Sequence, residues 1–333
     1  MISKINTYVI ALLLLSFSFA SEQRIAALGG NAGFWAEDDQ NLYMFPATMH
    51  NFNLAQINVN DGASASFLFG EGTKYGFMMD AGTDNLINMA YGSGSWGLLL
   101  GLDLNSSESG DVKTSDNTIE LGFGLNSGFG ELGLGLYTFS SDDGDSETDD
   151  PSMMNIGFNL RREQSLWEFS HMLVSFNLTS SEQGEAKSSG MSLGLDLYRH
   201  WTLSETSDLL FAAGLKYNSM TNEPGGEADK EEETQIILPN FTFAVETNLL
   251  EWATVRAGVN NMHELNSTNK VGDTEVKTMG ASEFDLAFGL GLEYGGFKLD
   301  LDLTPGFFVD PVSFITGFND QALASQFSIT YAW

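Results

Sequence analysis

The chain has no cysteine among its 333 residues. It can therefore form no disulfide framework, no thiolate zinc site and no cysteine nucleophile, and it cannot carry the acylated cysteine of a lipoprotein anchor. Proline is scarce, with 6 residues, whereas glycine is abundant, with 36. The absence of cysteine excludes disulfide-stapled secreted domains and thiol enzymes.

Positive charge is the second scarcity. Lys and Arg together number 14 against 45 Asp and Glu, which gives a formal net charge of −31. Affinity for nucleic acid depends on clustered Lys and Arg, so nucleic acid is excluded as an expected partner. Hydrophobic residues make up 42% of the chain, which is enough apolar surface to argue against intrinsic disorder.

Residues 1–20 have the layout of a secretory signal peptide. Lys4 precedes an apolar run from Tyr8 to Phe19, and Ser18 and Ala20 place small residues at the −3 and −1 positions. A membrane-spanning helix needs roughly 20 apolar residues, which is longer than this run. We therefore expect a leader that is cleaved before Ser21 rather than a membrane anchor.

The rest of the chain alternates apolar residues with polar residues or glycine. The stretches 119–126, 191–198 and 284–293 show the pattern clearly. Successive side chains of a β-strand point to opposite faces, so each stretch has one apolar face and one polar face. No comparable stretch has helical spacing, and the mature chain is predicted to be all-β.

The expected connections alternate between long and short. This sorting puts every long loop on one rim, as in a transmembrane β-barrel, whereas the Greek-key connections of a soluble sandwich would break it. The pattern therefore predicts a transmembrane, antiparallel, up-and-down β-barrel with acidic surface loops. The long connectors are expected at 105–116, 140–151, 179–188, 221–233, 261–281 and 305–322, and the short ones at 93–95, 127–129, 162–164, 201–207, 249–251 and 295–296.

The count of alternating stretches gives about 14 strands. A further pair at 52–59 and 63–70 would raise the number to 16. Both numbers are even, as bacterial single-chain barrels require. We prefer 14 and divide the chain into a leader at 1–20, an N-terminal segment at 21–50 and a barrel at 51–333.

The polar faces of the strands are expected to line the lumen. An Arg or Lys that faces lipid at the bilayer midplane costs about 2–4 kcal/mol, so the charged positions should point inward. Leu290→Arg should then disrupt folding, whereas Gly289→Ser should be tolerated. Inward glycines either widen the lumen for a ligand or relieve crowding where strands bend. The charged lumen candidates are Arg161, Asp196, Lys216, Arg256, Asp285 and Lys298, and the inward glycines are Gly122, Gly124, Gly133, Gly135, Gly194, Gly289 and Gly291.

The last strand ends in an aromatic residue at the terminal carboxylate. Phe327, Tyr331 and Trp333 alternate along it on one face. This pattern resembles the C-terminal signal by which outer-membrane barrels are recognised for assembly. The resemblance implies the outer membrane of a diderm bacterium, with outer-membrane lipid and the barrel-assembly machinery as partners.

Residues 24–47 resemble the amino-terminal stretch of the FadL-type and PorV-type outer-membrane barrels. Leu28-Gly29-Gly30, Gly33, Asp38-Asp39 and Pro46-Ala47 match the family pattern, while Phe45 stands where an Asn is expected. The resemblance implies a 14-stranded barrel with this segment plugging or lining the periplasmic mouth. It also implies passage or binding of a small, hydrophobic solute, or a non-conducting scaffold for protein export as in the PorV type.

The residues of the same segment support a plug independently. Glycine permits close backbone approach and positive φ, and the aromatic residues are unusually apolar for a flexible periplasmic tail, which is the alternative. The plug candidates are Gly29, Gly30, Phe34, Trp35, Phe45 and Pro46.

Signals for metal, cofactor or catalysis are weak. The run 142–150 holds six carboxylates, but an EF-hand frame from Asp143 puts Thr148 at the glycine position and Met154 at the closing glutamate, so a solvated loop is favoured. There is no phosphate-binding loop, and no metal or cofactor is expected. No nucleophile–base motif surrounds the histidines, so an enzyme is the third hypothesis after transport and scaffold. The four histidines are His50, His171, His200 and His263.

Overall fold

The computed structural model describes residues 21–59, 63–80, 87–109, 112–144, 150–226, 229–306 and 324–333. These residues form one antiparallel sheet that closes on itself. Strand β1 (Leu54–Val59) pairs with β2 (Ala63–Phe69) on one side and with β17 (Ala324–Ala332) on the other, which joins the two ends of the chain. The expected leader at 1–20 lies outside the described residues.

Neighbouring strands follow one another around the ring in sequence order. β14 (Thr274–Thr278) and β15 (Ser282–Tyr294) pair with different parts of β13, so they occupy one strand position and the barrel has 16. The remaining strands are β3 (Thr73–Asp80), β4 (Ile87–Ser93), β5 (Trp96–Ser109), β6 (Val112–Ser127), β7 (Gly130–Asp142), β8 (Pro151–Leu166), β9 (Phe169–Gln183), β10 (Ala186–Ser204), β11 (Ser207–Glu223), β12 (Glu231–Leu250), β13 (Ala253–Val271) and β16 (Phe297–Leu303).

The preferred count of 14 strands, and the count that the family resemblance implies, are wrong; the alternative of 16 is confirmed. The difference is the pair β1 and β2, which are only 6 and 7 residues long. Such short strands carry little alternation, and what identifies β1 as wall is its ladder with β17, 270 residues away along the chain. Sequence periodicity is a local property, so it cannot show that two strands so far apart in the chain pair with each other.

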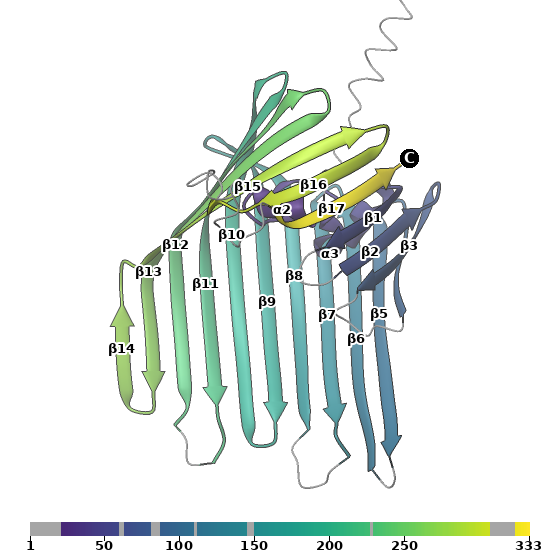
Figure 1. Cartoon of the computed structure of the whole chain (residues 1–333). Coiled ribbons are helices and arrows are strands. Elements are labelled where there is room, and N and C mark those ends of the chain that lie inside the picture. The colour runs from purple at the N-terminus through teal and green to yellow at the C-terminus, as the bar shows by residue number, and fades with distance from the viewer. Residues whose placement is uncertain are drawn as a thin grey trace, which may run out of the picture.

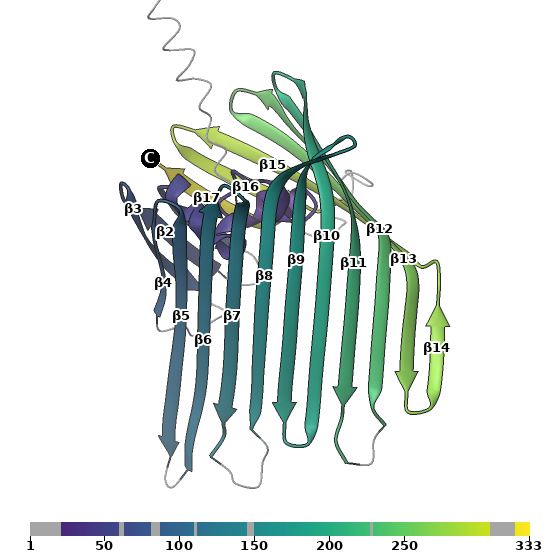
Figure 2. The same ribbon diagram turned by 180° about the vertical axis from the view of Figure 1, so that it is seen from behind.

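Several expected long loops are strand instead. β5 continues to Ser109 and β6 begins at Val112, while β9 and β10 are joined by a turn at 184–185. Apolar alternation ends where a strand leaves the lipid, but backbone pairing needs no apolar side chain and continues beyond it. The strands β5–β13 therefore form a tall wall, and β1–β4 and β15–β17 are shorter, as Figures 1 and 2 show.

The two faces of the wall differ as the alternation predicts. Leu193, Leu195 and Phe243 are among the large apolar residues exposed on the outer surface, whereas Asp196 and Arg256 are buried on the inner one. A closed antiparallel barrel with an even strand number, apolar outside and polar inside, is the fold of bacterial outer-membrane β-barrels. None of the helices among the described residues has the length and apolar character needed to cross a membrane.

The N-terminal segment, residues 21–53, lies inside the ring. It contains α2 (Glu22–Ala27), η1 (Ala32–Phe34), α3 (Asn41–Met44) and η2 (Pro46–Asn51). Ser21 caps α2 by accepting a hydrogen bond from the Arg24 backbone N–H, and Gly29 and Gly30, both at positive φ, turn the chain after it. The segment sits at the end of the barrel that holds the C-terminus and the short turns 128–129, 167–168, 205–206, 251–252 and 295–296, here called the short-turn end (Figure 1).

Candidate functional site

The N-terminal segment is packed against the inner wall by apolar contacts. The ring centroids of Phe34 and Tyr198 are 5.1 Å apart, and those of Trp35 and His200 are 4.8 Å apart. Sequence reasoning missed this surface, because the lumen face was taken to be polar throughout. The available signal was the run 209–213, which is apolar on both faces. The wall contributes Leu173, Tyr198, Leu210, Ala212 and Ala244, and the segment contributes Ile25, Leu28, Ala32, Phe34, Trp35 and Phe45.

A second apolar cluster holds the other half of the segment. Leu42, Met49 and Phe52 pack there with residues of the short strands β1–β4. The backbone of η2 also lies against β4, β5 and β6. Two of the plug candidates are buried here: Phe45, which belongs to the first cluster, and Pro46, which follows it. Both ends of the segment are thus fixed to the wall.

Lumen glycines make room for the backbone of the segment. A Cβ at Gly133 would collide with the Met44 carbonyl oxygen, and one at Gly124 with the Ala47 backbone nitrogen. At Gly289 it would lie 2.5 Å from the Ala27 Cβ. This is a third use of inward glycine, beside the two that the sequence suggests, and it contradicts the expectation that Gly289 faces open lumen. Gly97 and Gly258 meet the segment in the same way.

Not every inward glycine has this role. Gly135 has no atom within 4 Å of its added Cβ, so it borders open lumen. At Gly291 the Cβ would meet the Arg256 guanidinium at 2.7 Å, and at Gly194 it would meet the Ser175 hydroxyl at 2.5 Å. At Gly122 it would meet the Leu99 side chain at 3.0 Å.

Buried ion pairs join α2 to the wall. The Arg24 guanidinium lies 2.6 Å from an Asp38 carboxylate oxygen and 2.9 Å from one of Glu246. Arg256, one of the lumen candidates, pairs with the same Glu246 and reaches Asp300 at 2.7 Å. The network therefore links the segment to β12, β13 and β16. Lys298, also a lumen candidate, is 3.9 Å from Asp300.

The family-like pair Asp38-Asp39 is buried beside this network. Burial raises the pKa of Asp38 to about 6, although the charge of Arg24 opposes the rise. Burial, and then the charge of Asp38, raise the pKa of Asp39 well above its usual range. Asp39 accepts a hydrogen bond from the Gln56 side-chain amide at 2.9 Å, which ties it to strand β1.

Arg161 lies where the middle of the segment meets the wall. Its guanidinium donates to the Gly33 carbonyl at 3.1 Å and to the Asn41 side-chain oxygen at 2.9 Å, and it pairs with Glu131 on the neighbouring strand. It also lies over the Phe45 ring, 4.6 Å from the centroid. Phe45 thus packs against a lumen arginine.

The remaining lumen candidates lie farther from the segment. Asp196 is buried and accepts a hydrogen bond from Asn240 at 3.3 Å. Lys216 lies close enough to interact electrostatically with Asp196. Asp285 is exposed and stands opposite Asn260 in the ladder between β13 and β15. The structure therefore brings Arg161, Arg256 and Lys298 to the segment, but not Asp285.

A cavity of about 650 Å³ lies between the segment and the wall. A chain of hydrogen bonds crosses its lining from strand to strand: Ser192 donates to Asn218, Asn218 to Gln235, and Gln235 to the Glu264 carboxylate at 2.7 Å. The lining is polar with an apolar part, and it consists of Asn31, Met44, Leu173, Ser175, Ser192, Gly194, Asp196, Lys216, Asn218, Gln235, Ile237, Met262, Glu264, Ala281, Ser282 and Glu283. A smaller cavity of about 330 Å³ shares Met44 with it.

The C-terminal aromatic residues lie on the outer surface of the barrel. Tyr331 packs against Phe297 with ring centroids 4.6 Å apart, and Trp333 stacks on Tyr331 at 5.9 Å. Phe327 faces outward on the same strand. The Trp333 backbone N–H donates to the Asn53 carbonyl, so the chain end is fixed to the residue just before β1.

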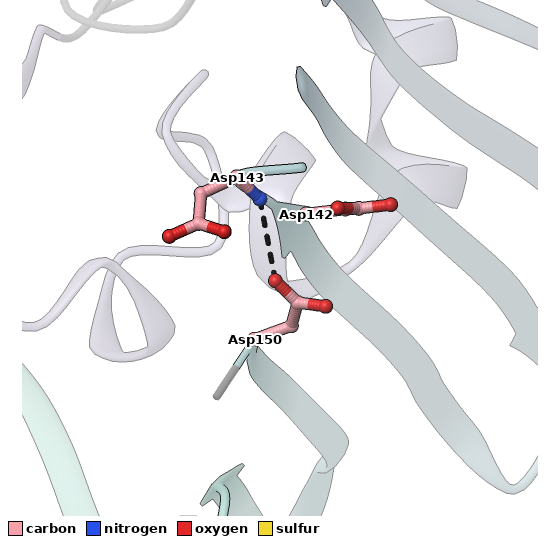
Figure 3. Close-up of side chains that lie close together, drawn as sticks. All are labelled: Asp142, Asp143 and Asp150. Carbon is pink, nitrogen blue, oxygen red and sulfur yellow. Dashed lines mark hydrogen bonds between the residues drawn. The ribbon is translucent and has the colours of Figure 1, made fainter. Parts of the chain in front are cut away.

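One group of acidic residues among the described residues brings its carboxylates close enough together to hold a metal ion. Asp142, Asp143 and Asp150 are exposed, with carboxylate oxygens within 4.8 Å of one another, and Figure 3 shows the Asp143 backbone N–H donating to Asp150 at 3.2 Å. Residues 145–149 of this loop lie outside the described residues. His200 bonds to the Phe34 carbonyl at 2.7 Å and His171 to Ser170.

Comparisons with known proteins add little beyond the fold. No family model and no curated protein matches the chain. Among solved structures it is similar to the ferric citrate transporter FecA, with 10% identity, a TM-score of 0.44, and coverage of 75% of this chain and 43% of that one. It is also similar to OmpT of Vibrio cholerae, with 12% identity, a TM-score of 0.32, and coverage of 84% and 95%.

A third structure, the Ralstonia pickettii toluene transporter TbuX, has 9% identity and a TM-score of 0.24, with coverage of 96% of this chain and 98% of that one. Because the similarity to FecA covers 43% of that protein, this chain spans less than half of its length. Identities of this size say nothing about a substrate, so the function has to be argued from the lumen itself.

Proposed function

We propose that this chain is an outer-membrane protein of a diderm bacterium, similar to the FadL and PorV types, that binds a small, partly hydrophobic solute in its lumen and passes it across the membrane. The observation that carries the proposal is the cavity of about 650 Å³ between the segment and the wall. Its volume lies within the roughly 300–1,000 Å³ of small-molecule sites. Asn31 and Met44 of the segment form part of its lining, so a bound solute would touch the element that fills the short-turn end.

The lining supports a solute with both apolar and polar parts. Leu173, Ile237 and Met262 offer apolar surface, while the Ser192–Asn218–Gln235–Glu264 chain presents amide and carboxylate groups. Most sites for small molecules combine a largely apolar lining with a few fixed polar groups that orient the ligand. The proposal assigns no catalytic step to the chain.

A mutation that fills the cavity tests binding and passage. Ser175→Trp places an indole inside the cavity, and Leu178→Trp on the same strand β9 places one on the lipid side as a matched control. The purified barrel should enhance the fluorescence of N-phenylnaphthylamine and swell liposomes in small amphipathic solutes. Ser175→Trp should reduce both signals and Leu178→Trp should reduce neither. Equal behaviour of the two variants would contradict the cavity as the site.

A second function, a non-conducting scaffold of the PorV type, is favoured by a different observation. The segment is held by two apolar clusters and by buried ion pairs, which is more than a freely moving gate requires. Under this hypothesis the wild-type barrel conducts no solute, and a protein partner co-purifies with it in fixed ratio. Single-channel conductance together with the mass of the complex in mild detergent separates the two functions.

The proposed location depends on the chain end. If the aromatic pattern of the last strand is read by the assembly machinery, Trp333→Asp should lower the amount of heat-modifiable barrel in the outer membrane. Tyr294→Asp, an exposed aromatic at the short-turn end outside the last strand, is the control. Normal levels of the Trp333 variant would contradict the assembly role.

A further inference from the structure

Ser21, the residue that follows the expected cleavage point, is fully buried inside the barrel. Its hydroxyl donates to an Asp300 carboxylate oxygen at 2.9 Å and accepts from the Arg24 backbone N–H at 3.2 Å. The helix that it caps lies against β13, β15, β16 and β17. A residue at the start of a flexible tail would have none of these contacts.

The buried network around Ser21 is short of positive charge. Arg24 and Arg256 together bind Asp38, Glu246 and Asp300. One carboxylate oxygen of Asp39 is buried without a hydrogen-bond donor among the described residues. The other oxygen accepts from Gln56, and the charge of Lys298 also acts on this group. A carboxyl group buried in this way either takes up a proton or gains a cation. The carboxylates are Asp38, Asp39, Glu246 and Asp300, and the cations are Arg24, Arg256 and Lys298.

We propose that cleavage before Ser21 creates an α-ammonium group that completes this network and locks the N-terminal segment in the lumen. Water adds across the Ala20–Ser21 peptide bond: its oxygen goes to the Ala20 carbonyl carbon, and the freed Ser21 nitrogen gains protons to become –NH₃⁺. The signal-cleaving protease supplies the catalysis. The inference rests on the expected leader, and it concerns the segment that forms part of the lining of the proposed solute cavity.

Covalent geometry places the new charge on the Asp300 side of this network. The α-nitrogen of Ser21 is three bonds from its hydroxyl oxygen, so it lies within roughly 7 Å of the Asp300 carboxylate. The ammonium group offers three donors, whereas the peptide N–H of the uncleaved chain is neutral and offers one. With the ammonium present, four carboxylates face four cations. The raised pKa of Asp39 is what burial and the nearby charge of Asp38 produce while the fourth cation is missing.

One effect opposes the arrangement. A positive charge at the N-terminus of α2 faces the positive end of the helix dipole. That helix has only 6 residues, and dipole effects are small beside ion pairs that are buried and hydrogen-bonded. The attraction of the ammonium group to the buried carboxylates therefore outweighs its repulsion by the helix dipole. Segment locking is therefore linked to processing: the chain acquires its last cation only when the leader has been removed.

Periodate tests the position of the N-terminus directly, because it oxidises an N-terminal serine, an amino alcohol, to a glyoxylyl group. The protein is purified from outer membranes, and its intact mass identifies the first residue. Folded barrel should react at least about tenfold more slowly than the same protein in urea, because exchange with an open state limits access. A first residue other than Ser21, or equal rates in the two states, would overturn the proposal.

A second measurement separates charge from burial. Barrel refolded with an acetylated Ser21 nitrogen lacks the ammonium. In a variant whose other five tryptophans are replaced by phenylalanine, Trp35 fluorescence should move to longer wavelength as the segment loosens. Glu22→Gln, an exposed charge change next to Ser21, should leave the spectrum unchanged. An acetylated barrel with the spectrum of the unacetylated barrel would overturn the locking role. Neither readout uses solute transport, so failure of the proposed function would not be mistaken for failure of this inference.

Discussion

The two halves of the lumen share the strands β9–β13 but are filled differently. Toward the short-turn end the inner face carries Leu210, Ala212, Ala244 and glycines, and it is covered by the N-terminal segment. Farther along the same strands the inner face carries serine and amide side chains around a cavity. Inward and outward positions alternate in both halves, but a register shift in β12 between Ile237 and Asn240 moves its inward positions from even to odd residue numbers. The two halves differ in what fills them. The N-terminal segment fills the half whose inner face is apolar, and the cavity lies in the half whose inner face is mainly polar.

Loss of Arg24 should produce the largest change, because it removes the cation that ties the segment to the wall. Arg24→Met leaves the buried Asp38 without its cation and leaves Glu246 with Arg256 alone, and we expect a loss of about 3–5 kcal/mol in the free energy of unfolding. Urea titration of the barrel in vesicles measures it. Lys187→Met, which breaks an exposed pair with Glu182, is the control and should have no measurable effect. A stable Arg24→Met barrel would show that apolar packing alone fixes the segment.

A charge placed on the lipid-facing side of a strand tests which residues face outward. Leu290→Arg should destabilise the barrel by about 2–4 kcal/mol if the residue lies near the bilayer midplane. Leu290 faces away from the segment, next to Gly289 on β15, which faces it. The earlier expectation that Gly289→Ser is tolerated is revised, since Ala27 occupies the space. If vesicle-folded Leu290→Arg unfolds at the wild-type urea concentration, the inward and outward assignments must be exchanged.

Substitutions at two glycines of one strand test the difference between the two halves of the lumen most directly. Gly133 and Gly135 face the lumen from β7, but only Gly133 touches the segment. Gly133→Leu should cost about 1–3 kcal/mol, as overpacking does, and should raise ionic conductance by displacing the segment. Gly135→Leu should do neither. Urea titration and bilayer recording check both, and matching behaviour of the two variants would mean that the segment does not pack as described.

The pH dependence should be the smallest effect. In barrel with a neutral Ser21 nitrogen, the pKa of Asp38 is raised to about 6 by burial. A carboxyl group with a raised pKa in the folded state holds its proton longer than in the unfolded chain, so stability falls as pH rises from about 4 to about 6. The raised pKa of Asp39 extends this fall to higher pH. The loss should be roughly 1–2 kcal/mol, because coupling to Asp39 spreads the titration over the pair.

Comparison with Asp38→Asn checks the origin of this change. The variant should have a flatter stability profile between pH 4 and 6 in urea titrations of acetylated barrel. Cleaved barrel, with its ammonium next to Asp300, should also have the flatter profile. A profile that rises with pH would contradict the raised pKa.

How far the sequence could be interpreted differs from element to element. Strands such as β6 and β10 were predictable, because lipid on one side and a lumen on the other impose an alternation that stands within a single stretch of chain. The closing strands β1 and β2 were predictable only as the alternative count of 16, because β1 is defined by its ladder with β17 at the far end of the chain and not by local alternation. The ends of β5, β9 and β11 were read as loops, because polar strand beyond the lipid looks like loop in sequence.

The fold class can be predicted from the chain alone, because it follows from a local period of two. The same period gives the inward or outward direction of most strand positions, apart from the shift in β12. The contacts of the inward residues become known only from the folded barrel. Gly133 and Gly135 look the same in sequence, yet one is crossed by the Met44 carbonyl and the other borders open space. Arg256 and Asp285 are both inward charges, yet one is buried in ion pairs with Glu246 and Asp300 while the other is exposed. The physical reason is that the period of two tells only to which side of the sheet a side chain points. What the side chain contacts there depends on which distant segment of the chain folds against it.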